Sequence, residues 1–159
     1  NLKYADYSAR PDVPATVVDV ERGSIVRAAS ASLDGRTWTV YAGRTLAGRE
    51  ATWVGGGVDD LNFGSSPCGP GVGIALMKRC GVLGINKARV FYGRVRGEVV
   101  SVEGRNIAGT TFAGTVRNGW FLVPYTETSA RPFPLEFVGR DAGGRVVATL
   151  DRFGRLARP

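Results

Sequence analysis

Apolar and polar residues alternate along this chain in short runs. The clearest run is 37–42, where Trp38, Val40 and Ala42 fall on one parity and more polar residues fall on the other. A period of two is typical of β-strands, since successive side chains point to opposite faces of a sheet. Similar runs predict strands over 16–20, 24–33, 37–42, 50–54, 89–95, 98–102, 110–116, 120–125, 135–140 and 145–150.

One stretch also fits another element. Residues 17–33 have apolar spacing that an amphipathic helix could use. Gly23 and the β-branched residues around it weaken a helix, so a strand is the preferred prediction there.

Two dipeptides mark turns between neighbouring strands. Asp34-Gly35 precedes the run at 37–42, and Asn118-Gly119 precedes the apolar run at 120–125. Both central residues of a type I′ turn have positive φ, which Asp, Asn and Gly tolerate best. We therefore expect a β-hairpin at each of these two positions.

Short strands with turn residues at intervals of about eight to twelve residues indicate an all-β fold. The fold class expected is an antiparallel β-sandwich of the immunoglobulin-like kind, or a small barrel. No strand–helix–strand alternation favours a parallel sheet. We expect a leader or linker over 1–14, a single β domain over 15–151 and a frayed basic tail over 152–159.

A glycine-rich stretch over 55–84 interrupts the strands and contains both cysteines, Cys68 and Cys80. We expect a long loop with a short helical turn over 74–79. With no further Cys or His to complete a zinc site, the cysteines form either a disulfide that closes the loop or a pair of free, packed thiols, and the disulfide is the preferred interpretation. Such a loop closure stabilises a fold by about 3 kcal/mol in the chain-entropy model. Because disulfides persist outside the cytosol, the protein is expected to be extracytoplasmic, either secreted or membrane-anchored, with a signal or anchor segment before Asn1 in the full-length protein.

Composition narrows the chemistry. The chain of 159 residues is 43% hydrophobic and 22% charged, as in ordinary globular domains, and it contains no histidine. Catalytic triads that use histidine and most zinc enzymes are therefore excluded. We expect no enzyme activity, no cofactor and no metal. No apolar run approaches the roughly 18 residues of a membrane span.

The formal net charge is +7, and arginine supplies 18 of the 21 basic residues. The arginines occur singly along the chain and form no basic run, so a scattered, solvated basic surface is preferred over a dedicated nucleic-acid site. The expected partner is a protein or a component of the cell envelope, and an anionic partner would suit the charge.

A few residues are candidates for binding. Trp120, Arg117 and Tyr125 lie at or after the second predicted hairpin, and they would form a binding patch if exposed. Asp59 and Asp60 could offer oxygen ligands to calcium, but they lack the spacing of an EF-hand and are better interpreted as solvated loop residues.

Motifs for catalysis are weak. The glycine clusters lead into neither a Walker-type nor a dinucleotide-binding sequence. A hydrolase would need a serine at 65–66 with Lys78 or Lys87 as its activator, or Glu98 and Glu103 converging across a groove.

Several segments together resemble a known group of domains. They are Val90–Val95, Val99–Val102, Asn118–Phe121 and Arg140–Val147. This pattern resembles extracytoplasmic domains of actinobacterial membrane-anchored or secreted proteins of unassigned function. The resemblance implies a small β-sandwich at the cell surface and brings no catalytic residues.

The function predicted from the sequence is that of a non-enzymatic, exported or cell-surface β-sandwich module that binds a partner. Two alternatives stay open: an envelope hydrolase using carboxylates or a Ser-Lys pair, and a basic, OB-like barrel that binds nucleic acid.

Overall fold

The computed structural model describes residues 21, 23–24, 26–48, 50–55, 75–85, 87–128 and 134–157. These residues form eleven β-strands and no helix, which confirms the all-β class. The strands are β1 Val26–Leu33, β2 Arg36–Arg44, β3 Glu50–Gly55, β4 Met77–Ile85, β5 Ala88–Val95, β6 Ser101–Asn106, β7 Thr111–Ala113, β8 Thr115–Arg117, β9 Trp120–Thr126, β10 Pro134–Arg140 and β11 Val146–Leu150. The described part of the chain thus has no helix of the length and hydropathy that crossing a membrane would require.

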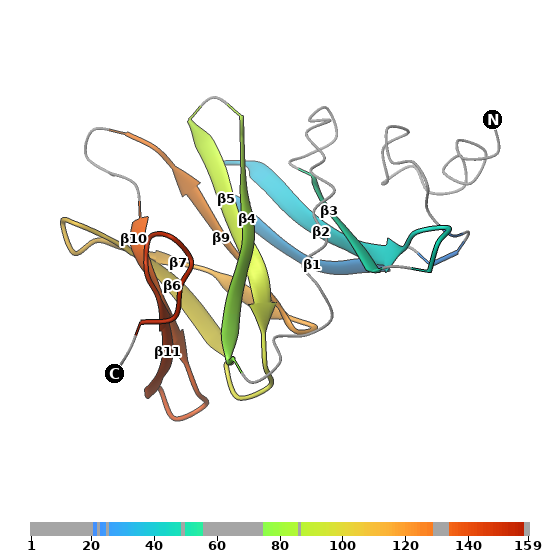
Figure 1. Ribbon diagram of the computed structural model, residues 1–159. Coiled ribbons are helices and arrows are strands. Elements are labelled where there is room, and N and C mark those ends of the chain that lie inside the picture. The colour runs from blue at the N-terminus through green and yellow to red at the C-terminus, as the bar shows by residue number, and fades with distance from the viewer. Residues whose placement is uncertain are drawn as a thin grey trace.

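The strands make three antiparallel sheets, as Figure 1 shows. The first sheet has the order β1-β2-β3, the central sheet β4-β5-β9-β8 and the last sheet β11-β10-β6-β7. None of these sheets closes on itself within the described residues, so the predicted small barrel is not what the structure shows. The sequence predicts two packed sheets, whereas the structure has three.

The central sheet is covered on both faces, and this explains its unbroken apolar strands. On β9, the run Trp120–Tyr125 is buried at every position. Trp120 and Leu122 pack with the first sheet, while Phe121 and Val123 pack with the last. Because neither face of β9 meets water, the strand does not alternate between apolar and polar residues.

Two separate cores result. The core between the first and central sheets consists of Ala28, Ala29, Ala31, Trp38, Val40, Val54, Val90, Tyr92, Trp120 and Leu122. The core between the central and last sheets consists of Met77, Phe91, Val95, Val99, Val102, Phe121, Val123, Tyr125, Phe137, Ala148 and Leu150. The sequence favours the core for most aromatic residues, and this is confirmed for Trp38, Phe91, Phe121 and Phe137. Trp120, which the sequence offered as a possible binding residue, is buried as well.

Both predicted hairpins are present. Asp34 and Gly35 have φ values of 52° and 74°, and Asn118 and Gly119 have values of 53° and 76°. These positive values are those that a two-residue type I′ turn needs. They place Leu33 opposite Arg36 and Arg117 opposite Trp120.

Residues 110–116 do not form the single strand predicted. Gly114 separates β7, in the last sheet, from β8, in the central sheet. A β-carbon at Gly114 would lie 2.8 Å from the carbonyl oxygens of both Leu122 and Val102. Only glycine fits there, and its position lets one segment pass from one sheet to another.

The prediction of a loop through residue 84, with a helical turn over 74–79, is wrong for β4. This segment is a nine-residue strand paired with β5. A β-carbon at Gly81 would lie 2.8 Å from the hydroxyl of Tyr92, so this glycine makes room for the tyrosine ring instead of marking a loop. The rest of the predicted loop, residues 56–74, lies outside the described residues, as does the predicted leader over 1–14.

The strand ends also differ in two places. β6 begins at Ser101, three residues later than predicted, because Val99 N–H bonds to the carbonyl of Arg96 in a turn. The tail is expected to be frayed, but its described residues, 152–157, are hydrogen-bonded to the domain. Leu156 bridges to Leu150, and Ala157 N–H donates to the Thr149 carbonyl oxygen over 2.8 Å.

Candidate functional site

A half-open groove of about 380 Å³ lies where the first and central sheets meet. It is lined by Arg27, Ala28, Ala29, Ser30, Thr115, Arg117 and Asn118, which come from β1, from β8 and from the turn after β8. We call it the β1–β8 groove. Both strands are edge strands of their sheets, so the groove runs between two sheet edges.

The geometry of β1 places its arginine on the outside. The register of β1 against β2 shifts between Arg27 and Ala29. Because such a bulge changes which residues face the core, Ala28 and Ala29 are both buried while Val26 and Arg27 are both exposed. The Arg27 side chain therefore lies at the rim of the groove.

A hydrogen bond holds the two walls together. Asn118 Nδ2 donates to the carbonyl oxygen of Ala28 over 2.8 Å, joining the β8–β9 turn to β1. A second bond lies at the other end of β1: Thr126 Oγ1, at the end of β9, donates to Asp34 Oδ2, just after β1, over 2.7 Å. β1 is thus fixed at both ends alongside β9, and Arg117 next to the turn is held close to β1.

A row of basic residues crosses the central sheet beside this groove. Lys78 of β4 lies opposite Arg94 of β5, Arg94 lies opposite Trp120 of β9, and Trp120 lies opposite Arg117 of β8. Residues in such a row share one face of a sheet. The Arg94 guanidinium carbon lies 4.3 Å from the centre of the Trp120 ring, which it covers.

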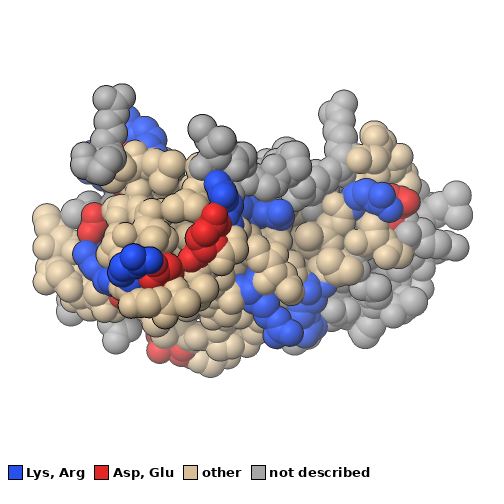
Figure 2. Space-filling view, turned by 90° about the horizontal axis from the view of Figure 1, so that it is seen from below, with Lys and Arg blue, Asp and Glu red and all other residues tan. Residues whose placement is uncertain are grey.

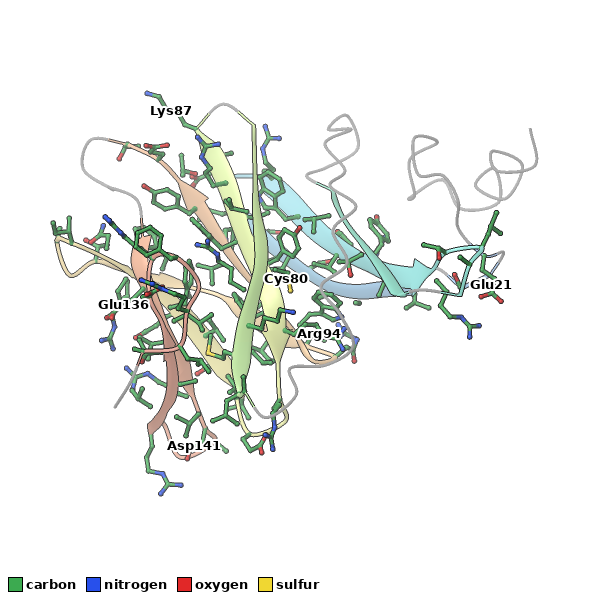
Figure 3. All side chains as sticks on the ribbon, in the orientation of Figure 1. Glu21, Cys80, Lys87, Arg94, Glu136 and Asp141 are labelled. Carbon is green, nitrogen blue, oxygen red and sulfur yellow. The ribbon has the colours of Figure 1, made fainter. Side chains whose placement is uncertain are left out.

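The row and the groove form one basic surface. Figure 2 shows Lys and Arg side chains gathered near the middle of the face it presents, while acidic side chains lie mainly toward the last sheet. In Figure 3, Arg94 lies at one end of the central sheet, and Lys87 lies at the other. None of the described residues that line the groove is acidic. Placing Lys78 directly across from Arg94 is unfavourable by itself, since like charges on neighbouring strands repel.

The residues predicted from the sequence have different places. Arg117 is exposed and lines the groove. Trp120 and Tyr125 are only 2% and 1% exposed, so the condition for a patch made of them, that they be exposed, is not met. Asp59, Asp60 and Cys68 lie outside the described residues. Cys80 is partly buried beside the core of the first and central sheets.

Sequence reasoning missed Arg27, Ser30 and Thr115 as groove residues beside Arg117, and Arg94 as a member of its row. No local signal could have found Arg27, because its outward position depends on the bulge in β1. Arg94 could have been found from the hairpin register only with knowledge that β5 pairs with β9.

The carboxylates considered for catalysis are held in ion pairs. Glu98 lies 2.7 Å from Arg96. Glu103 lies 3.1 Å from Arg105 and 3.2 Å from Arg140. Partial burial opposes ionisation of Glu103, but hydrogen bonds from both arginines outweigh it and lower its pKa. The two glutamates are therefore paired with different arginines.

Of the other groups considered for a hydrolase, the structure describes the two lysines but not the serines. Lys78 and Lys87 are exposed on β4 and in the turn after it, and serines 65 and 66 lie outside the described residues. Within the parts of the chain that the structure describes, no three His, Cys, Asp or Glu side chains come together as a metal site.

Comparison with known proteins adds no relative to this picture: no protein-family model, no curated protein and no solved structure matches the chain.

Proposed function

We propose that this protein is a non-enzymatic, exported binding module whose β1–β8 groove binds an anionic component of the cell envelope. The observation that carries the proposal is the composition of the groove. Arginines from two different sheets, Arg27 and Arg117, face it together with the hydroxyl residues Ser30 and Thr115 and the amide of Asn118. Guanidinium groups bind phosphate and carboxylate through paired hydrogen bonds, and hydroxyl and amide groups add donors.

The neighbouring row of basic residues supports the same ligand class. Lys78, Arg94 and Arg117 occupy one row of the central sheet, and adjacent strands lie about 4.8 Å apart. Lys78 and Arg94 are one strand spacing apart, while Trp120 lies between Arg94 and Arg117, which are two spacings apart, so a flexible anionic polymer could contact all three cations. Trp120 beneath Arg94 restricts the orientation of that guanidinium, which lowers the entropy lost on binding.

We also propose that Cys68 and Cys80 form a disulfide and that the protein works outside the cytosol. Cys80 lies on β4, beside the core that the first sheet covers. A bond to Cys68 would tie the segment after β3 to this strand. It would stabilise the fold by closing a loop in the unfolded chain, which lowers the conformational entropy of that chain. The resemblance to actinobacterial extracytoplasmic domains supports the same compartment. Thiol titration of the unreduced, denatured protein should find no reactive thiol, and two reactive thiols would refute the disulfide.

The groove can be tested by calorimetric titration with inorganic polyphosphate and polygalacturonate, using neutral dextran as the uncharged control. Arg117→Gln should weaken polyanion binding about tenfold, because a hydrogen bond to a charged group is lost. Lys87→Gln removes the same charge at the opposite end of the central sheet and should change binding less than about twofold (Figure 3). If the two variants weakened binding equally, the groove would not be the binding site, and the net charge of the protein alone would account for polyanion binding.

Two further results would overturn the wider proposal. Tighter binding of single-stranded DNA than of either polymer would favour the nucleic-acid alternative. Shortening of a bound polymer during incubation would favour the hydrolase alternative.

A further inference from the structure

Two turns near the end of the chain have the same construction. In Asp141–Arg145, the Asp141 carboxylate accepts hydrogen bonds from the backbone N–H groups of Gly143 and Arg145 over 2.9 and 3.0 Å. In the second turn, Asp151 accepts the equivalent bonds from Phe153 and Arg155, both over 2.9 Å. The final arginine of each turn donates Nε to the other carboxylate oxygen over 2.9 Å. We call these the Asp141 turn and the Phe153 turn.

A third turn shows which residues this construction needs. Asn106 accepts backbone hydrogen bonds from Ala108 and Thr110 over 3.0 and 2.9 Å. The fourth residue is a glycine in all three turns, with φ of 78° at Gly109, 81° at Gly144 and 77° at Gly154. A first residue that accepts two N–H bonds and a left-handed glycine are therefore sufficient.

The middle residues vary, and two of the three turns expose a large apolar side chain: Ile107, 76% exposed, in the Asn106 turn and Phe153 in the Phe153 turn. The Asp141 turn has Ala142 and Gly143 where the Phe153 turn has Arg152 and Phe153. Since alanine and glycine serve in the first case, the fold does not require arginine and phenylalanine in the second. Phe153 is nevertheless 59% exposed to solvent.

Cations surround this exposed ring. The guanidinium carbons of Arg152 and Arg155 lie 4.5 and 5.0 Å from the ring centre of Phe153. Arg79 of β4 donates Nη1 to the Arg152 carbonyl oxygen over 3.0 Å, which fixes the turn to the central sheet. Leu156, just after the turn, is 46% exposed. The only acid in the turn, Asp151, is already paired with Arg155.

We infer that the Phe153 turn docks on an anionic membrane surface, with the phenyl ring entering the headgroup region and Arg152 binding a lipid phosphate. The turn follows β11, an edge strand of the last sheet, and Figure 1 draws it in red on the near side of that sheet. A protruding apolar ring flanked by cations suits a deformable interface that offers negative charge above an apolar phase. A soluble polyanion offers no such phase, so it would leave the ring in water.

Vesicle sedimentation tests the inference directly. The wild-type protein should sediment with vesicles of equal parts phosphatidylcholine and phosphatidylglycerol, and much less with phosphatidylcholine alone. Phe153→Gly, which copies the residue of the Asp141 turn, should weaken vesicle binding about tenfold through loss of apolar burial. Arg152→Ala should weaken it about fivefold. Thermal unfolding should show that both variants stay folded.

The Asp141 turn supplies a gain-of-function control. Ala142→Arg with Gly143→Phe places the same pair on the same kind of turn and should strengthen vesicle binding. Lys87→Gln removes one positive charge outside both the groove and the Phe153 turn and should change vesicle binding less than about twofold, so the loss expected for Arg152→Ala would not be an effect of net charge alone. The inference would be overturned if Phe153→Gly bound vesicles as tightly as the wild type. It would also be overturned if this variant lost as much affinity for soluble polyphosphate as for vesicles.

Discussion

At three turns of this protein, a side-chain carboxylate or amide oxygen accepts hydrogen bonds from backbone N–H groups of the same turn. Asp141, Asp151 and Asn106 each accept two backbone N–H bonds inside their own turn. Backbone hydrogen bonds from Arg145 and Arg155, with smaller contributions from their side chains, lower the pKa values of Asp141 and Asp151. Carboxylates held ionised in this way link the stability of the fold to pH.

Acid should therefore destabilise the protein through these groups. A carboxylate with a lowered folded pKa stabilises the fold above its unfolded pKa and loses that contribution as pH falls through the folded value. The ordinary values are 3.8 for the two aspartates and 4.5 for Glu103, so the melting temperature should begin to fall below about pH 4.5 and continue to fall below 3.8.

A double variant, Asp141→Asn with Asp151→Asn, tests this link. Asn106 shows that an asparagine can accept the same backbone bonds, so the variant should fold and lose less stability on acidification than the wild type. Melting temperatures measured between pH 7 and pH 3 would check it. Parallel curves for the two proteins would contradict the assignment to these aspartates.

Exposure of a single side chain was harder to predict than its backbone conformation. The left-handed turn at Asn118 and Gly119 follows from local chemistry, and the sequence predicted it correctly. Trp120, the next residue, could have been exposed at a hairpin tip. It is buried because β1, some ninety residues earlier in the chain, packs across β9 and is held there by Asn118.

At the scale of strands, glycines decide where a segment can bend or approach a neighbour. Gly114 lets one segment serve two sheets, and Gly81 leaves space for the Tyr92 ring. The sequence by itself indicates only ordinary strand or loop positions for both. Their roles depend on partners far along the chain, and alternation within a segment carries no information about such partners.

Gly114→Ala should destabilise the protein by about 2 kcal/mol, since two backbone carbonyls cannot move away from the added methyl group. Gly97→Ala is the matched control, because a β-carbon there would meet no atom within 4 Å. It should change the free energy of unfolding by less than about 0.5 kcal/mol. Urea denaturation of the three proteins checks the prediction, and a neutral Gly114→Ala would show that β7 and β8 can separate without strain.

For the molecule as a whole, the central sheet is the common partner of two cores. β5 and β9 supply residues to both, whereas β3 and β11 lie at outer edges. Opening of β9 would expose both cores together, while an edge strand can open by itself at a smaller cost in free energy.

Native-state hydrogen exchange should therefore find the slowest amides in β9 and β5. Amides of β3 and β11 should exchange faster, through local opening that leaves the central sheet intact. Equal protection in β11 and β9 would contradict this order and indicate that all three sheets open in one step.

Taken by itself, the sequence determined the strand-rich class, both two-residue hairpins and most of the aromatic core, because alternation, turn residues and side-chain size act over a few neighbouring positions. Tertiary structure alone decided that there are three layers, that residues 77–85 form a strand, and that Arg27 and Arg117 face one groove. The reason is physical: which strand edges meet, and which faces are covered twice, depends on contacts between segments far apart in the chain.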